Sequence, residues 1–226
     1  MAQVGIHSLL VLPIKKIAPA KKGLLLGIML GSILPDADNF AVAAATLTGG
    51  SVDGLHRTYT HSLITAIALI IILYLVGLIF KKKTIGYFGI GLGIGVSMHI
   101  AVDLLLWFNG VELFWPFASW VNLWSNFTPS EFWMDLMNPL EFLFIGLFFM
   151  ALSAEAKKFG TNIEFLGKLR IWTYVQFILT VIFLILMFIT TSSLVPTIHG
   201  AFYLLSLILL IVVVIKMRQT VEGKTS

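Results

Sequence analysis

Cysteine is absent from this chain of 226 residues, and charged side chains make up only 12% of it. The absence of cysteine excludes disulfides, a thiolate nucleophile and cysteine-based zinc sites, so histidine and carboxylate groups must supply any metal ligands. The scarcity of charge, with 58% hydrophobic residues and a mean hydropathy of +0.98, excludes an ordinary water-soluble surface. We therefore expect an integral membrane protein.

Apolar runs long enough to cross the membrane, which takes about 20 helical residues, lie near 61–80, 84–107, 138–156, 171–191 and 198–217. Two shorter runs, Gly5–Ile14 and Gly23–Leu34, are separated by lysines and predict short, re-entrant or interfacial helices. The expected fold is all-α, a polytopic transmembrane bundle of about five to seven membrane helices.

We expect two domains. Residues 1–156 would form a membrane domain that holds the polar site, and residues 157–226 a two-helix extension with a short tail. Within the first, residues 108–137 hold Trp115, Trp120, Trp124 and Trp133 among polar residues, which is typical of amphipathic segments at headgroup level. This segment predicts an interfacial cap.

Lysine and arginine clusters predict the orientation. They lie at 81–83, 157–170 and 216–224, separated by pairs of apolar runs, and the positive-inside rule makes their side cytoplasmic. The 39–60 connection would then be extracytoplasmic. Such clusters suit topogenic signals and anionic lipid headgroups better than nucleic acid, so we expect membrane lipids as partners and no nucleic acid.

His99 and Asp103 stand four residues apart inside an apolar run, on one face of the expected helix, where both can reach the same ion or proton. Ionisable groups at membrane depth are costly and usually paired or functional. The alternative is a buried hydrogen-bonded pair that only locks helix packing. The alternate glycines 89–95 before it predict close helix packing rather than a phosphate-binding loop.

Two further segments carry candidate ligands. Asp36 and Asp38 follow Pro35 and would bring two carboxylates into a metal site, or would simply end a helix with solvated side chains. A five-residue separation would put His56 and His61 on different faces of one helix, so joint ligation requires His56 on a loop and His61 in the first helical turn. The alternative there is a polar loop before an N-cap at Thr60 or Ser62.

Other polar residues give weaker signals. Arg57, beside an exposed helix N-terminus, suits a phosphate or carboxylate. His7 alone is typical of a helix surface, and only the other candidates draw it toward a site. We expect His199 to be interfacial, and Glu141 to be interfacial or solvated.

Together, His7, Leu34-Pro35-Asp36, His56-Arg57-x-x-Thr60-His61-Ser62 and His99-x-x-x-Asp103, followed by Gly110 and Trp115-Pro116, resemble the LexA-regulated, inner-membrane-associated metal-dependent hydrolase family. The resemblance covers roughly residues 5–140, and that family is similar to zinc-dependent phospholipase C. It implies metal ligation by the following residues: His7, Asp36, His56, His61, His99 and Asp103. A further His-x-x-x-Glu pair of the soluble relatives is missing here, so one or two metal ions are expected.

The function that this pattern predicts is hydrolysis of a phosphoester, either a phospholipid or a lipid-linked phosphate, at the outer membrane interface. Zinc suits imidazole and carboxylate ligands, and manganese or iron would also accept them. Asp36 or Asp38 would take the proton of the attacking water, and Arg57 would neutralise developing charge. The alternatives are a transporter or channel that binds a divalent cation or protons through the same residues, and an inactive scaffold with a structural metal.

Overall fold

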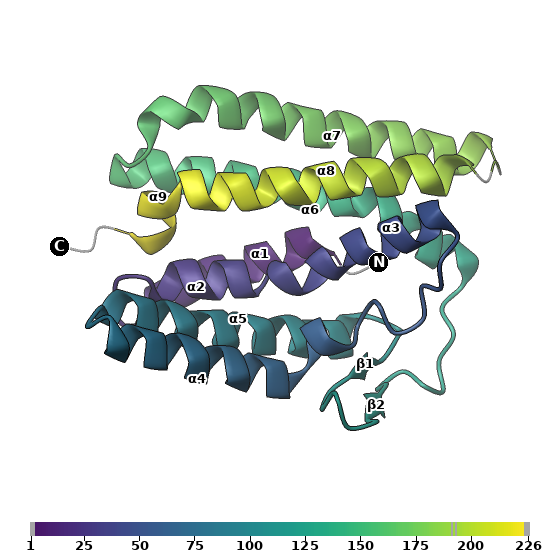
Figure 1. The fold of residues 1–226 in the computed structure, drawn as a ribbon. Helices are drawn as coiled ribbons and strands as arrows, with labels where there is room; N and C mark the ends of the chain where they lie inside the picture. Colours follow the sequence, from purple (N-terminus) through teal and green to yellow (C-terminus); the bar gives the residue numbers. More distant parts are fainter. Residues whose placement is uncertain (1–2, 191, 193, 224–226) are drawn as a thin grey trace. The chain divides into compact units, whose positions relative to one another are not determined.

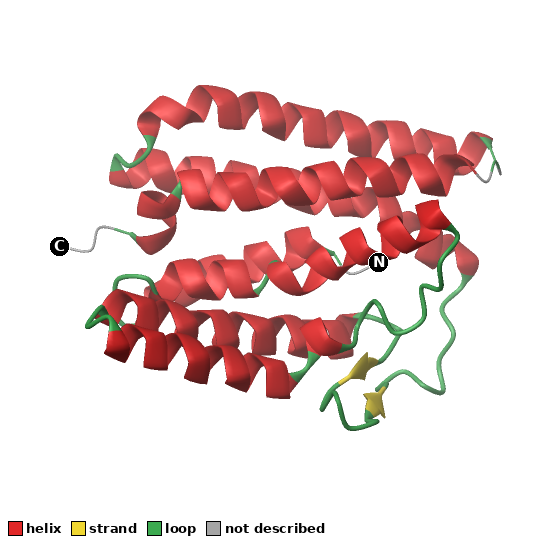
Figure 2. Cartoon of the chain, viewed as in Figure 1, coloured by secondary structure: helices red, strands yellow, loops and turns green. Residues whose placement is uncertain are grey.

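The computed structural model describes residues 3–190, 192 and 194–223, so the last three residues of the expected tail lie outside the described part. Within the described residues the regular secondary structure is helical apart from one short hairpin, and loops join the elements (Figure 2). Four helices are long and apolar enough to cross a membrane, and a bent helix pair makes a fifth candidate. The predicted all-α polytopic bundle is confirmed.

The chain divides into two compact units. One comprises residues 3–10 and 129–220, and the other residues 11–128 with the residues from Val221 onward. The division falls before the long helix α6 (Glu131–Phe159), and the expected domains 1–156 and 157–226 stay a prediction. The division falls there because α6 packs along α7 (Leu166–Ile189) and also contacts α8 (Leu194–Lys216).

Residues 129–220 form a helical layer of α6, α7 and α8 (Figure 1). Its buried core includes Phe148 and Leu152 of α6 and Leu210 of α8, and Gln176 of α7 donates a hydrogen bond to Ser206 of α8 at 3.1 Å. The outward face of α7 stays apolar, with Ile178 and Ile185 more than half exposed. Such a surface suits contact with lipid.

The other helical elements at or near residues 3–10 and 129–220 are short. They are α1 (Val4–Val11), the 3-10 turn η4 (Ile163–Phe165) and α9 (Arg218–Glu222).

In the second unit α5 (Lys83–Leu106) lies between α2 (Leu24–Gly31) and α4 (Leu63–Ile79), side by side with both (Figure 1). Glycines permit this close approach. A Cβ at Gly31 would collide with the carbonyl oxygen of Leu92, and one at Gly91 with that of Leu24. Gly93 faces the other neighbour, α4, at Ile70. The glycine run therefore packs helices, as the sequence predicted.

The rest of this unit is made of short elements that connect the helices. They are the 3-10 turns η1 (Leu12–Lys16), η2 (Leu34–Asp38) and η3 (Tyr59–His61), helix α3 (Asn39–Thr48), and the strands β1 (Val111–Glu112) and β2 (Trp120–Val121). The strands pair antiparallel, with Val111 opposite Val121. The tryptophan-rich segment after α5 is thus a hairpin and loop up to Ser130, and α6 begins at Glu131. Its place at the membrane interface stays a prediction.

Candidate metal centre

A broken helix supplies the first part of the site. Helix α2 ends at Gly31, η2 follows from Leu34, and α3 continues at an angle, the pair being bent by 46°. Pro35 at the start of η2 has no N–H to donate to the preceding turn, which favours the break. At this break the side chains of Asp36 and Asp38 are buried, with relative exposures of 0% and 3%. The alternative of two solvated aspartates is wrong.

Helix α5 supplies the second part. His99 and Asp103 lie one turn apart on its buried face, and His99 reaches across to α2. Its Nδ1 is 2.9 Å from the carbonyl oxygen of Ser32, one of the carbonyls that a helix leaves without an intrahelical partner at its C-terminal end. Because a carbonyl can only accept, His99 carries its proton on Nδ1 and presents the lone pair of Nε2 to the site.

The loop before α4 supplies the third part, and Asp38 holds it in place. One carboxylate oxygen of Asp38 lies 2.7 Å from Nδ1 of His56. The other accepts hydrogen bonds from the Thr60 hydroxyl at 2.7 Å and the Arg57 backbone N–H at 3.2 Å. This last bond holds Arg57 in the left-handed region, with φ of 62°, a conformation that costs a non-glycine residue about 1 kcal/mol.

His61 ends η3 and points into the same space. Its Nδ1 is 2.9 Å from Thr60 Oγ1 and 3.3 Å from Asp38 Oδ2. Since the Thr60 hydroxyl already donates to Asp38, both oxygens act as acceptors and the proton of His61 lies on Nδ1. Burial lowers the pKa of His61 below its ordinary value, against the opposing effect of its hydrogen bond to Asp38. His61 is therefore held as a neutral imidazole with its Nε2 lone pair toward the site.

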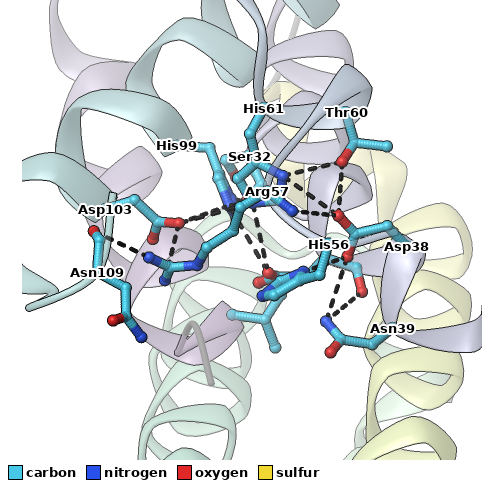
Figure 3. Close-up of polar contacts among 12 residues, drawn as sticks. Ser32, Asp38, Asn39, His56, Arg57, Thr60, His61, His99, Asp103 and Asn109 are labelled. Atoms are coloured by element: carbon cyan, nitrogen blue, oxygen red, sulfur yellow. Dashed lines mark hydrogen bonds and ion pairs between the residues drawn. The ribbon is translucent and has the colours of Figure 1, made fainter. Parts of the chain in front are cut away.

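The Nε2 atoms of His61 and His99 face each other at 3.1 Å. Asp36 Oδ1 lies 3.9 and 3.7 Å from them, and Asp103 Oδ2 lies 3.6 and 3.8 Å from them. All four side chains have zero relative exposure, and Figure 3 shows His61, His99 and Asp103 converging. Two facing lone pairs flanked by two carboxylates are stabilised by a shared cation, either a metal ion or a proton.

Arg57 lines the edge of this cluster. Its Nη2 lies 3.2 Å from Asp103 Oδ2, and its Nη1 donates to the carbonyl oxygen of Asn109 at 3.2 Å (Figure 3). The β1–β2 hairpin fixes the backbone of Arg57, because the N–H of Glu112 donates to the Arg57 carbonyl at 2.9 Å. Arg57 is buried, with 5% exposure. Its guanidinium thus stands beside the cluster and not in open solvent.

Seven of the residues singled out in the sequence come together in this one unit: Asp36, Asp38, His56, Arg57, His61, His99 and Asp103. His7 lies in α1 of the other unit, so its part in the site stays a prediction. The sequence did not predict two contacts that support the site. They are the contact of His99 with the Ser32 carbonyl and the hydrogen bond from the Thr60 hydroxyl to Asp38. Thr60 was considered only as a helix cap, a role that Ser62 fills by accepting from the N–H of Ile64.

Two residues expected at the membrane interface are buried in the helices of residues 129–220. Glu141 is 2% exposed and accepts a hydrogen bond from the N–H of Gly5 at 3.3 Å. His199 is 4% exposed, its Nε2 lies 2.9 Å from the Asn138 carbonyl oxygen, and its ring packs edgewise against Phe142. Both lie on the inward faces of long helices, and these faces form the core. The sequence could not distinguish inward from outward faces, because apolar residues occur on both.

The structure is that of a polytopic helical membrane protein with a buried His/Asp cluster at a helix break. Its sequence matches the family model of the YdjM inner membrane protein over residues 2–221. The chain therefore belongs to the YdjM inner membrane protein family. Neither a curated relative nor a solved structure matches it at a significant level. The family description supports the membrane location and carries no statement about catalysis.

Proposed function

We propose that this protein is an integral-membrane, metal-dependent hydrolase that cleaves a phosphoester. The observation that carries the proposal is the pair of Nε2 atoms of His61 and His99, 3.1 Å apart, with carboxylates on either side. Each imidazole is fixed through its other nitrogen by an acceptor, which is the support that metal-binding histidines usually have. A purely structural pair would need no such orientation of both rings toward one point.

The separations of the candidate ligand atoms fit a metal ion. Four ligands at bond lengths of about 2.0–2.1 Å around zinc stand about 3.3–3.4 Å from one another in a tetrahedron. The two histidine nitrogens and the oxygens of Asp36 and Asp103 show N–N and N–O separations from 3.1 to 3.9 Å. His61, His99 and Asp36 form one candidate metal group, and Asp103 would complete the ligand set. Water would enter as a fifth ligand, a coordination number that catalytic zinc sites can reach.

A second group, Asp38 with His56 and His61, also brings ligand atoms within 4.8 Å of one another. It uses the other nitrogen of His61, the one that carries the proton toward Asp38 and Thr60. A neutral imidazole offers only one lone pair, so the two groups do not bind metal together. We therefore propose one metal ion, with Asp38 as a positioning residue in place of the role of base that the sequence offered it.

His56 takes a different part in this proposal. Its side chain is 24% exposed, whereas that of Asp38 is fully buried, so the 2.7 Å contact between them forms a carboxylate–imidazole pair that opens outward. Asp38 orients the ring through this contact, and we propose that His56 donates a proton to the leaving oxygen. A metal held at the neighbouring ligands would supply Lewis acidity and would activate water near neutral pH.

A phosphoester is the substrate class that the charges favour. The guanidinium of Arg57, buried beside the cluster, is a planar donor suited to phosphoryl oxygens. The family is an inner membrane one, and the positive-inside pattern favours a site that opens toward the extracytoplasmic side. A phospholipid or lipid-linked phosphate could reach such a site by lateral diffusion, and this is the substrate we propose.

The test is metal-dependent turnover in lipid. Protein purified without chelator and loaded with zinc, manganese or iron is reconstituted into vesicles that contain a panel of phospholipids and lipid-linked phosphates, and released phosphate or headgroup is measured. We expect release by the wild type and none by a His99→Ala/Asp103→Ala double variant. No release from any lipid by protein that holds its metal would refute the proposal.

A second candidate rests on the same pair of nitrogens, because a proton shared between His61 and His99 also relieves the contact between their lone pairs. The cluster would then bind protons or a divalent cation during transport, as ionisable groups inside membranes often do. Metal analysis separates the hydrolase from proton transport, and the lipid turnover assay separates it from transport of a divalent cation. A purified protein that holds no zinc, manganese or iron after reconstitution favours the proton, and a pH-jump flux assay in vesicles then tests transport.

A further inference from the structure

A groove between α6 and α7 lies outside the His/Asp cluster. It encloses about 500 Å³ and is lined by residues of both helices. Lys157 and Arg170 stand on opposite sides of it, Lys157 near the end of α6 and Arg170 near the start of α7. Because a short connection joins the end of α6 to the start of α7, both cations lie at the same end of this antiparallel helix pair.

The two cations are available for an external partner. Lys157 and Arg170 are exposed, and no carboxylate of the described residues lies within ion-pair distance of either. Gly167, which also lines the groove one turn before Arg170, has no atom within 4 Å of where its Cβ would be, so the groove is open at this point. The end of the groove beside the α6–α7 connection thus combines positive charge with room for an anion.

Further into the span the lining becomes apolar. On α7, Tyr174 and Phe177 follow Arg170 at positions four and seven residues later, on the same helix face. On α6, Met150 lies seven residues before Lys157, again on one face. Both walls therefore run from a cation at the helix end to apolar side chains in the membrane-spanning part. A headgroup followed by an acyl chain has the same order of polarity.

We propose that this groove binds an anionic phospholipid, with the headgroup phosphate between Lys157 and Arg170 and the acyl chain along Met150 and Phe177. Basic pockets between membrane helices are a recognised site of such lipids. A soluble phosphate would use only the charged end and leave the apolar walls without a partner. The proposal does not depend on the hydrolase function, because it involves none of the residues of the His/Asp cluster.

The test counts bound lipid by native mass spectrometry of the full chain in mild detergent, titrated with phosphatidylglycerol or phosphatidylethanolamine. We expect one phosphatidylglycerol to bind at least tenfold more tightly than phosphatidylethanolamine. Lys157→Gln/Arg170→Gln should weaken this binding by roughly tenfold to thirtyfold, at about a fivefold loss for each charge near the headgroup. Both side chains are exposed, so the double variant should keep its fold, which circular dichroism checks.

Two matched variants separate a built site from general surface charge. Lys158→Gln/Lys168→Gln removes the same charge from neighbouring positions that do not line the groove, and binding should fall less than threefold. Gly167→Leu keeps both cations but fills the groove one turn before Arg170, and binding should fall at least fivefold. Equal losses in the two double variants, unchanged binding in Gly167→Leu, or no preference for phosphatidylglycerol in the wild type would overturn the proposal.

Discussion

Replacing His99 by alanine tests the proposed metal centre most directly. His99 contributes an Nε2 atom 3.1 Å from that of His61 and has no exposed surface, so its loss removes a ligand without altering the exterior. His56→Ala is the matched comparison, because it also removes an imidazole. In the one-metal arrangement the imidazole of His56 contacts Asp38 and does not bind the ion. The two variants should therefore behave differently.

The magnitude follows from the number of ligands. A four-ligand zinc site in a small protein is worth about 10–16 kcal/mol, or about 2.5–4 kcal/mol for each ligand. At about 1.4 kcal/mol per tenfold, His99→Ala should weaken metal affinity by roughly two to three orders of magnitude. Asp38→Asn, which removes no ligand but disturbs the support of His61 and of the loop before α4, should cost about tenfold to a hundredfold. His56→Ala should change affinity by less than about threefold.

The assay is metal content by inductively coupled plasma mass spectrometry, followed by competition with a chromophoric chelator in detergent. Thermal unfolding with the chelator present checks that each variant folds without metal. We expect one equivalent in the wild type and the order His99→Ala, Asp38→Asn, His56→Ala from the largest loss to the smallest. Two equivalents in the wild type, or equal losses in His56→Ala and His99→Ala, would refute the one-metal assignment.

Three further predictions follow from the same geometry. Metal affinity should be constant above about pH 7 and fall at lower pH, since protons compete for imidazoles of ordinary pKa about 6.5. The lowered pKa of His61 moves its own competition to lower pH, and equal affinities at pH 7 and pH 5 in the chelator competition would contradict this. Gly31→Ala should destabilise the protein by about 1–3 kcal/mol, because the new Cβ meets the Leu92 carbonyl, whereas Gly167→Ala, with open space, should not; thermal unfolding compares them. Arg57→Gly should be about 1 kcal/mol more stable than Arg57→Ala, since glycine adopts the φ of 62° without strain, and equal melting temperatures would exclude that strain.

The long helices could be predicted from the sequence because membrane spans need uninterrupted apolar runs. The expected span at 84–107 corresponds to α5 at Lys83–Leu106, and that at 198–217 to α8 at Leu194–Lys216. The helix in the run expected at 61–80 begins later, at Leu63, because His61 belongs to a separate 3-10 turn, and at 17 residues it is not among the four helices long enough to cross a membrane. Length and hydropathy locate such spans but do not identify the turn that ends or precedes them.

Helix α3 and the hairpin could not be predicted in the same way. Residues 39–48 were treated as part of a connection, yet Asn39–Thr48 is helical, which its alanines favour but its short length obscured. Strands β1 and β2 have two residues each, too few for an alternating pattern to appear. Tertiary contacts decide both elements, since the hairpin holds the Arg57 carbonyl through Glu112.

The site shows where residue spacing stops being informative. The four-residue spacing of His99 and Asp103 predicted their common face, but the partners of His99 come from a backbone carbonyl at Ser32 and a histidine 38 positions earlier. The resemblance implied the same ligand role for His56 and His61, whereas in the structure both turn Nδ1 toward Asp38 and only the buried His61 also presents Nε2 to His99. The bent pair of α2 and α3 produces this difference, because the break places Asp38 under the loop and Asp36 beside the imidazoles. The chemical roles therefore depend on where the helix breaks, and the residue types alone could not assign them.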